Sequence, residues 1–237
     1  MSALLEATGL SLSGRLKETD LAIRGGELTC LIGPNGSGKT SLLHALAGIG
    51  HPSGNVLIDG ADPRGLPSDR RKLLFSYLPA SRDVGWPLAA RDVVALGSAG
   101  GKDGGAIHQV LADLDLGGFA ARRIDRMSTG ERSRVLIARA LVAKPRALLL
   151  DEPAANLDPY WQLKLMDYLR VSARQNGQAM LVAVHDLELA HIYADRLIIM
   201  HAGRIEADGD PASLLSGDCI PRIFRIERFQ GRWQPIG

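Results

Sequence analysis

The chain has 237 residues with a formal net charge of +2, and 46% of its residues are hydrophobic, which is enough for one domain with a sizeable core. The nearly balanced charge argues against a nucleic-acid partner, and two distant cysteines, Cys30 and Cys219, support neither a disulfide framework nor a zinc site. No segment approaches the ~20 apolar residues of a membrane span, and the N-terminus lacks the features of a secretion signal, so we expect a cytoplasmic chain.

The first elements are predicted strands. Residues 4–12, 20–24 and 55–59 are interpreted as strands that form a small antiparallel β region together with part of a nucleotide-binding sheet. Between them, Glu27–Ile32 is a short apolar run that indicates a buried strand, and residues 41–49 have the apolar spacing of a helix. The segment that joins this strand to this helix is rich in glycine.

That joining segment is a predicted phosphate-binding loop. Its sequence GPNGSGKT fits the pattern G-x-x-x-x-G-K-[ST] at every fixed position, between a strand and a helix as the pattern requires. Such a turn points successive backbone N–H groups into one hollow, and the helix N-terminus adds its positive dipole end. Lys39 is expected to reach the β- and γ-phosphates, and the Thr40 hydroxyl to bind Mg²⁺. The predicted phosphate-binding residues are Gly33, Pro34, Asn35, Gly36, Ser37, Gly38, Lys39, Thr40 and Ser41.

Further along the chain, a helical pattern opens with MSTGER at residues 127–132. Ser128 or Thr129 is typical of an N-cap, and Glu131 favours the first turn because its charge complements the helix dipole. One interpretation is an ordinary capped helix. The functional interpretation is a second phosphate-binding helix N-terminus, made from Ser128 and the backbone of Gly130.

Two adjacent carboxylates, Asp151 and Glu152, end the next apolar strand pattern, at residues 147–150. Successive side chains of a strand point to opposite faces, so the two acids can take different roles. Asp151 suits Mg²⁺, directly or through water. Glu152 suits the attacking water, as a general base or as the group that orients it. Two acids at a strand end face solvent about as often, but beside a phosphate loop they indicate catalysis.

Together these features resemble the nucleotide-binding subunits of ABC transporters. MSTGE at 127–131 resembles the LSGGQ signature of that family, and LDEP at 150–153 matches the end of its Walker B motif. NLD at 156–158 resembles the D-loop, and His185 matches the switch histidine. With the phosphate loop, these motifs come in the family order and at family-like spacing over residues 3–216.

The resemblance implies an enzyme that hydrolyses ATP with Mg²⁺ and works as a head-to-tail dimer of identical copies. Each ATP would lie between the phosphate loop of one copy and the signature of the other. The signature residues expected to contact ATP are Ser128, Thr129, Gly130 and Glu131.

The resemblance also implies individual roles. Lys39, Glu152 and His185 would act at the γ-phosphate, and Asp158 would couple the two ATP sites across the dimer. The strand expected at 179–184 would deliver His185 to the sheet edge where ligands of parallel α/β sheets bind.

Some positions depart from the family pattern. Ala80 stands where the Q-loop usually has a Gln that touches Mg²⁺ or the attacking water, so we expect Ala80 to slow hydrolysis without abolishing it. Thr129 replaces the first glycine of the signature, and because a Thr resists positive φ, we expect ordinary helical or β backbone there. No aromatic residue at 10–15 can stack on adenine; Arg15 could lie over the base, or it could be an ordinary solvated arginine.

The expected fold class is α/β, with a phosphate-loop NTPase (RecA-like) core, a small antiparallel β region and a helical subdomain. Residues 90–96, 106–116 and 129–144 are predicted helices without strands between them. A short hairpin is expected in the tail, with its turn at Gln230 and Gly231. The chain is expected to be a single nucleotide-binding domain over residues 1–237, with a core at 1–88 and 147–216, a helical subdomain at 89–146 that docks on the permease, and a tail at 217–237.

We therefore expect the ATP-binding and ATP-hydrolysing subunit of a membrane ABC transporter. The tail and the missing aromatic are similar to ATPase subunits that import iron-siderophores, haem or cobalamin, which suggests a metal chelate as cargo. Its partners would be a second copy, integral-membrane permease subunits and indirectly a substrate-binding protein, at the cytoplasmic face of the inner membrane, and no nucleic acid. The alternatives are a soluble ABC ATPase acting on ribosomes or DNA, a regulatory subunit silenced by Ala80, or an exporter subunit.

Overall fold

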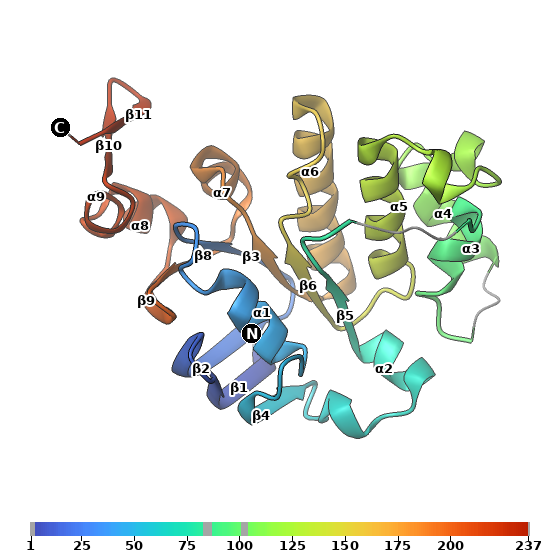
Figure 1. The fold of residues 1–237 in the computed structure, drawn as a ribbon, viewed down its shortest axis with the longest axis horizontal. Helices are drawn as coiled ribbons and strands as arrows, with labels where there is room; N and C mark the ends of the chain where they lie inside the picture. The colour runs from blue at the N-terminus through green and yellow to red at the C-terminus, as the bar shows by residue number, and fades with distance from the viewer. Residues whose placement is uncertain (1–2, 83–86, 101–103, 237) are drawn as a thin grey trace.

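The computed structural model describes residues 3–82, 87–100 and 104–236, which fold into sheets covered by helices (Figure 1). The strands are β1 (Ala3–Leu12), β2 (Leu16–Arg24), β3 (Glu27–Ile32), β4 (Ser53–Ile58), β5 (Phe75–Leu78), β6 (Ala147–Asp151), β7 (Ala179–Ala183), β8 (Arg196–His201), β9 (Arg204–Gly209), β10 (Ile226–Phe229) and β11 (Arg232–Pro235). The α-helices are α1 (Lys39–Leu46), α2 (Ser68–Leu74), α3 (Ala90–Ala95), α4 (Gly104–Asp113), α5 (Thr129–Leu141), α6 (Pro159–Asn176), α7 (Leu187–Tyr193), α8 (Pro211–Ser216) and α9 (Cys219–Phe224). Within these ranges, no helix has the length and apolarity needed to cross a bilayer.

The main sheet has the strand order β5-β6-β7-β3-β8-β9. All neighbouring strands are parallel except β9, which pairs antiparallel with β8. Helices cover both faces of such a sheet, so its central strands are apolar runs rather than alternating ones. Every residue of β6 and β7 is buried, and the prediction of a mainly parallel sheet is confirmed.

The central strands separate two apolar clusters. Leu148 and Leu150 of β6 belong to the cluster that includes α5 and α6, whereas Leu149 belongs to the cluster that includes α1. This alternation follows the two-residue repeat of a strand. Asp151 continues the Leu149 face, so β6 itself turns the Asp151 carboxylate toward α1.

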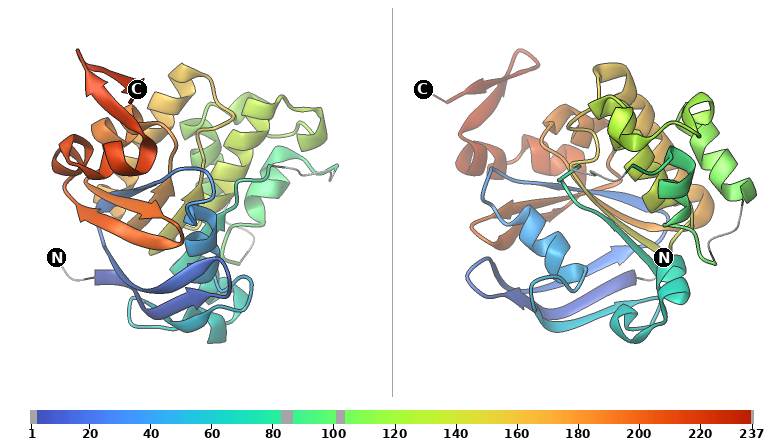
Figure 2. Two further views of the ribbon diagram at one scale, coloured as in Figure 1. Left: turned by 60° about the vertical axis from the view of Figure 1, so that its left-hand side comes forward. Right: turned by 45° about the vertical axis from the view of Figure 1, so that its right-hand side comes forward.

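The second sheet has the order β2-β1-β4 and is antiparallel throughout. Helix α1 lies between this sheet and the main sheet, and its leucines join both in one core (Figure 2). The expected small antiparallel region is therefore confirmed, with one correction. Within the described residues it forms a sheet of its own, because β1, β2 and β4 pair only with one another and not with a main-sheet strand.

The helices α3, α4 and α5 lie beside one another beyond the β5 edge of the main sheet (Figure 1). They correspond to the predicted helices at 90–96, 106–116 and 129–144. Helix α5 ends before the predicted boundary because Lys144 adopts a positive φ of 47° and Pro145 follows it. The division of the chain into a core, a helical subdomain and a tail remains a proposal.

The C-terminal hairpin β10–β11 projects from the body beside α8 and α9 (Figure 2). Its turn residues Gln230 and Gly231 have φ values of 47° and 78°. Two successive residues of positive φ match the twist of an antiparallel ribbon. The hairpin turn predicted at these two residues is confirmed.

Candidate nucleotide-binding site

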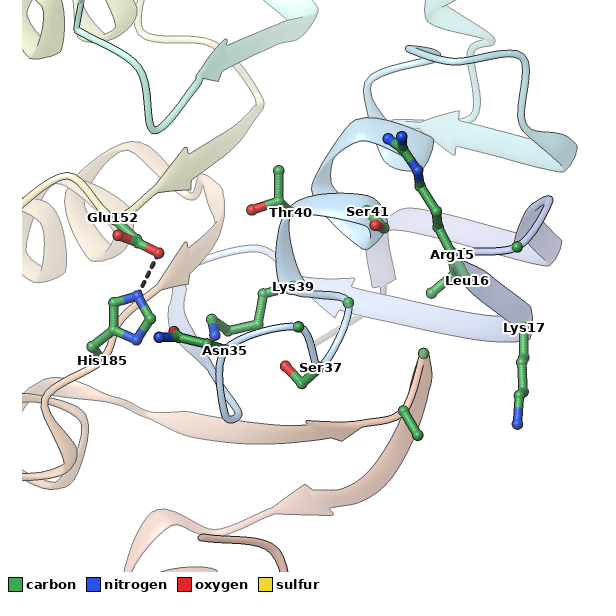
Figure 3. Close-up of a pocket in the computed structure, with 15 residues that line it drawn as sticks. Arg15, Leu16, Lys17, Asn35, Ser37, Lys39, Thr40, Ser41, Glu152 and His185 are labelled. Atoms are coloured by element: carbon green, nitrogen blue, oxygen red, sulfur yellow. Dashed lines mark hydrogen bonds and ion pairs between the residues drawn. The ribbon is translucent and has the colours of Figure 1, made fainter.

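A cavity of about 640 Å³ opens at the N-terminus of α1 (Figure 3). Its volume lies within the ~300–1,000 Å³ of small-molecule sites. The phosphate-loop residues 35–41 line it, and Glu152 and His185 reach it from the ends of β6 and β7. Because β6, β7 and β3 are adjacent strands, their carboxyl ends bring these groups to one edge of the sheet.

Lys39 packs against the backbone of the phosphate loop. Its Nζ donates hydrogen bonds to the carbonyl oxygens of Gly33 at 2.7 Å and Pro34 at 3.3 Å. Burial lowers the pKa of Lys39, and the negative charges of Glu152 and Asp151 oppose that shift. The ammonium group thus lies between the loop carbonyls and two acids, in the hollow where a phosphate would place its charge. Gly33 and Pro34 support this arrangement through their carbonyls and do not line the cavity.

Asp151 is fully buried, and neither of its carboxylate oxygens has a hydrogen-bond partner in the described part of the chain. Burial raises the pKa of Asp151, and the nearby Thr40 side chain acts in the opposite direction. An unpartnered buried carboxylate is costly unless a cation or a donor satisfies it. The oxygen donors Asp151 and Thr40 are therefore of the right chemistry to bind Mg²⁺.

Glu152 directly follows β6 and has a left-handed backbone conformation, with φ 51°. Its N–H donates to the carbonyl of Ala183 on β7, and one carboxylate oxygen contacts Nε2 of His185 at 2.5 Å (Figure 3). Such a backbone costs about 1–3 kcal/mol for a residue with a side chain. The turn at Glu152 places its carboxylate over the cavity, whereas the preceding acid points into the body of the protein.

The signature segment does not reach this cavity. Ser128 caps α5: its Oγ accepts from the N–H of Glu131 at 3.2 Å, and a Glu131 oxygen accepts from the N–H of Ser128 at 2.9 Å. The N-cap prediction is confirmed at Ser128. Thr129 begins the helix without a positive φ, as expected, and Gly130 follows it. Within one chain, these residues lie outside the lining of the cavity.

Two other predicted residues also lie apart from the cavity. Asp158 caps α6, where its Oδ1 accepts from the N–H of Trp161 at 3.0 Å. Ala80 is exposed after β5 and is not among the lining residues. Arg15 does line the cavity, which is compatible with the expected contact to the base.

The turn between β8 and β9 also contributes to the site, although no sequence motif predicted it: Ala202 and Gly203 line the cavity. The Gly203 N–H donates to the Ser37 carbonyl at 2.9 Å, and the Gly203 carbonyl accepts from the N–H of Lys17 at 2.9 Å. This turn therefore helps to fix the backbone of the phosphate loop through the hydrogen bond to Ser37. Ala202 and Gly203 have φ values of 48° and 75°, but the pair Ala-Gly is not one of the usual signals of such a turn, and the strand that follows it is largely polar.

The parallel sheet, the loop between β3 and α1 and the buried Lys39 define a phosphate-loop NTPase. The chain also matches the family model described as ABC transporter over residues 16–155. It belongs to this family and is an ABC ATPase, whose ATP hydrolysis is coupled to transport.

Named relatives span nearly the whole chain. A hemin import ATP-binding protein, HmuV of Mesorhizobium japonicum, is 37% identical over 220 residues, which are 86% of this chain and 83% of the relative. A cobalamin import ATP-binding protein, BtuD of Halobacterium salinarum, is 36% identical over 232 residues, 93% of this chain but 58% of the relative. A solved ATP-binding cassette, dimeric after hydrolysis with ADP and phosphate bound, is similar with a TM-score of 0.77 and 25% identity over 87% of this chain and 98% of that one.

Proposed function

We propose that this chain powers an importer of a metal chelate of the haem, cobalamin or iron-siderophore type, on the cytoplasmic face of the membrane. One observation supports the hydrolytic part of this proposal: the side chains of Lys39, Glu152 and His185 line the same cavity. Similarity to proteins named for hemin and cobalamin import supports the cargo class.

ATP phosphates would bind in the loop. The backbone N–H groups of residues 35–41 and the start of α1 offer donors and a positive dipole end. The Lys39 ammonium would exchange its bonds to the Gly33 and Pro34 carbonyls for bonds to phosphate oxygens. Because Lys39 already lies in the hollow, little reorganisation is needed when the nucleotide arrives.

Asp151 and Thr40 would hold Mg²⁺ beside the phosphates. The metal, when bound, neutralises phosphate charge and makes the γ-phosphorus a better electrophile. The contribution of this chain is a buried carboxylate beside the Thr40 side chain, fixed at the end of a fully buried strand.

Glu152 would accept the proton of the attacking water. The water oxygen forms a bond to the γ-phosphorus while the bond from that phosphorus to the β–γ bridging oxygen breaks, which releases ADP and phosphate. His185 contacts the Glu152 carboxylate and would keep that carboxylate correctly placed relative to the γ-phosphate. Catalysis would come mainly from positioning and charge stabilisation.

A second copy would complete the site. Ser128, Thr129, Gly130 and Glu131 lie outside the cavity of their own chain, which supports their use by the ATP of a partner copy. In a two-fold dimer each copy gives and receives the same contacts, with Asp158 beside the junction. The similar cassette solved as a dimer supports this arrangement. The helices α3, α4 and α5 would dock on permease subunits.

The hydrolytic role is tested with Glu152→Gln in the purified chain. We expect hydrolysis to fall by about 10²–10⁴-fold, with ATP binding changed by less than a few-fold because no phosphate contact is lost. The matched control is Glu6→Gln, an exposed acid on β1. Hydrolysis by Glu152→Gln at the wild-type rate would remove Glu152 from the mechanism.

The transport role is tested by purifying the chain from native membranes in mild detergent and identifying what accompanies it. A permease with many spans, together with a binding protein that takes haem or a corrinoid, is the expected result. A ribosome, a nucleic acid or an export permease would contradict the proposed import.

A further inference from the structure

Arg82 is a buried arginine that lies next to the nucleotide-binding site and belongs to none of the predicted motifs. It follows β5 by four residues, and only 6% of its surface is exposed. Arginine is almost never this buried unless it is paired. We therefore examine which groups the Arg82 guanidinium contacts.

The Arg82 guanidinium holds the turn that carries Glu152. Its Nη2 donates to the carbonyl oxygen of Asp151 at 3.0 Å and to the carbonyl oxygen of Glu152 at 3.2 Å. In an extended strand successive carbonyls point in opposite directions. They can share one donor here because Glu152 has left the strand conformation, with φ 51°. One nitrogen thus fixes the peptide groups on both sides of the Glu152 Cα.

Burial of the Arg82 guanidinium lowers the stability of the folded protein. Among the described residues the Arg82 guanidinium forms no ion pair within 4 Å, so its hydrogen bonds go to main-chain oxygens, although the Asp151 and Glu152 carboxylates lie close enough to attract its charge. Its Nε and Nη1 are buried without a partner among the described residues. A buried charge with unsatisfied donors destabilises a protein relative to an apolar side chain of similar size. A role of the Arg82 side chain in the active site would explain why position 82 holds an arginine and not an apolar residue.

We propose that Arg82 is a positioning residue for hydrolysis, which keeps the Glu152 backbone left-handed and thereby aims the Glu152 carboxylate at the attacking water. This inference rests on the role of Glu152 proposed above. The Ala80 methyl group cannot donate a hydrogen bond, whereas the Arg82 guanidinium does donate to the turn that follows β6.

The test compares Arg82→Met, which keeps length but removes the donors, with Arg82→Lys, which keeps a charge and a donor. We expect kcat of Arg82→Met to fall by about 10–100-fold, with the KM and Kd for ATP within twofold of wild type. Arg82→Lys should recover at least a third of the wild-type kcat. A loss of Kd and kcat in parallel, or no rescue by Arg82→Lys, would mean that Arg82 is only structural.

The matched control is Arg134→Met, which removes hydrogen bonds from a guanidinium to two successive main-chain carbonyls away from the cavity. Nη1 of Arg134 donates to the successive carbonyls of Leu114 and Asp115, at 2.8 and 3.4 Å. Arg134→Met should lower the urea midpoint while leaving kcat within twofold of wild type. If Arg82→Met does not fold, Arg82→Lys and Arg82→Gln decide the question through the same comparison of kcat with KM.

A double variant separates this inference from the proposed function. If Arg82 acts through Glu152, adding Arg82→Met to Glu152→Gln should lower the residual rate by less than twofold. Wild-type hydrolysis by Glu152→Gln alone would overturn the proposed function itself. An inactive Glu152→Gln beside a fully active Arg82→Met, or full additivity of the two losses, would overturn only the role of Arg82.

Discussion

Replacing Gly33 by alanine tests whether the shape of the phosphate loop depends on a close backbone approach. A Cβ at Gly33 would lie 2.4 Å from the carbonyl oxygen of Met200 and 2.5 Å from Oγ of Ser37. Carbon and oxygen atoms that are not bonded normally stay about 3.3 Å apart. The Ser37 side chain can rotate, but the Met200 carbonyl belongs to β8 of the main sheet. The loop would therefore have to shift by roughly 1 Å.

The magnitude follows from that shift. Overpacking of this kind lowers the free energy of unfolding by about 1–3 kcal/mol. A displacement of ~1 Å at a reacting group costs about 10²-fold in rate, and the loop carbonyl of Gly33 is also a partner of Lys39. We expect Gly33→Ala to remain folded, to lose most of its affinity for ATP and to lose at least ~10²-fold of its hydrolysis. Urea denaturation, equilibrium binding of a fluorescent ATP analogue and phosphate release measure the three quantities.

The control is Gly65→Ala, because a Cβ at Gly65 meets no atom within 4 Å and its φ is not positive. Gly65→Ala should match wild type in all three assays. If Gly33→Ala binds and hydrolyses ATP within twofold of wild type, the close approach to β8 does not shape the site and the reasoning is refuted.

Two further predictions concern Asp151 and Ala80. Burial raises the pKa of Asp151, so the folded state keeps its proton at pH values where the unfolded state, with a pKa near ~3.9, has lost it, and stability falls as pH rises through that window. Asp151→Asn should therefore unfold at higher urea than wild type at pH 7 while losing ~10²-fold or more of its hydrolysis, and a less stable variant would contradict this sign. Ala80→Gln adds one donor near the Q-loop, worth about 1 kcal/mol or roughly fivefold in kcat, and unchanged kcat would show that Ala80 does not limit turnover.

The parts of the fold that the sequence predicted well are those with local signals. Glu27–Ile32 is β3 with the predicted bounds, because a short apolar run between a turn and a glycine-rich loop has few alternatives. Ser128 and Glu131 form the predicted cap because both partners lie within one helical turn. The turn at Gln230 and Gly231 is equally local.

The features that escaped prediction depend on contacts between distant residues. The strand predicted at 20–24 begins earlier, at Leu16, because residues 16–19 pair with β1 although their sequence shows no apolar alternation. The Gly203 N–H donates to the Ser37 carbonyl because the neighbouring strands β8 and β3 bring these distant parts of the chain together, and Arg82 contacts Glu152 from 70 residues away. No pattern within a short window reports such pairings, since they exist only once β5, β6 and β8 are in place.

The order β6-β7-β3 means that the acids Asp151 and Glu152, His185 and the phosphate loop each lie at the end of one of three neighbouring strands. Adjacent strands lie ~4.8 Å apart, so main-chain hydrogen bonds set the lateral spacing of these groups. Substitutions among the apolar residues of these strands can then change stability while leaving that spacing intact. Most of the groups that line the cavity lie at or beyond the strand ends, so an engineer could improve thermal tolerance in the apolar strand interiors and catalytic rate at the strand ends.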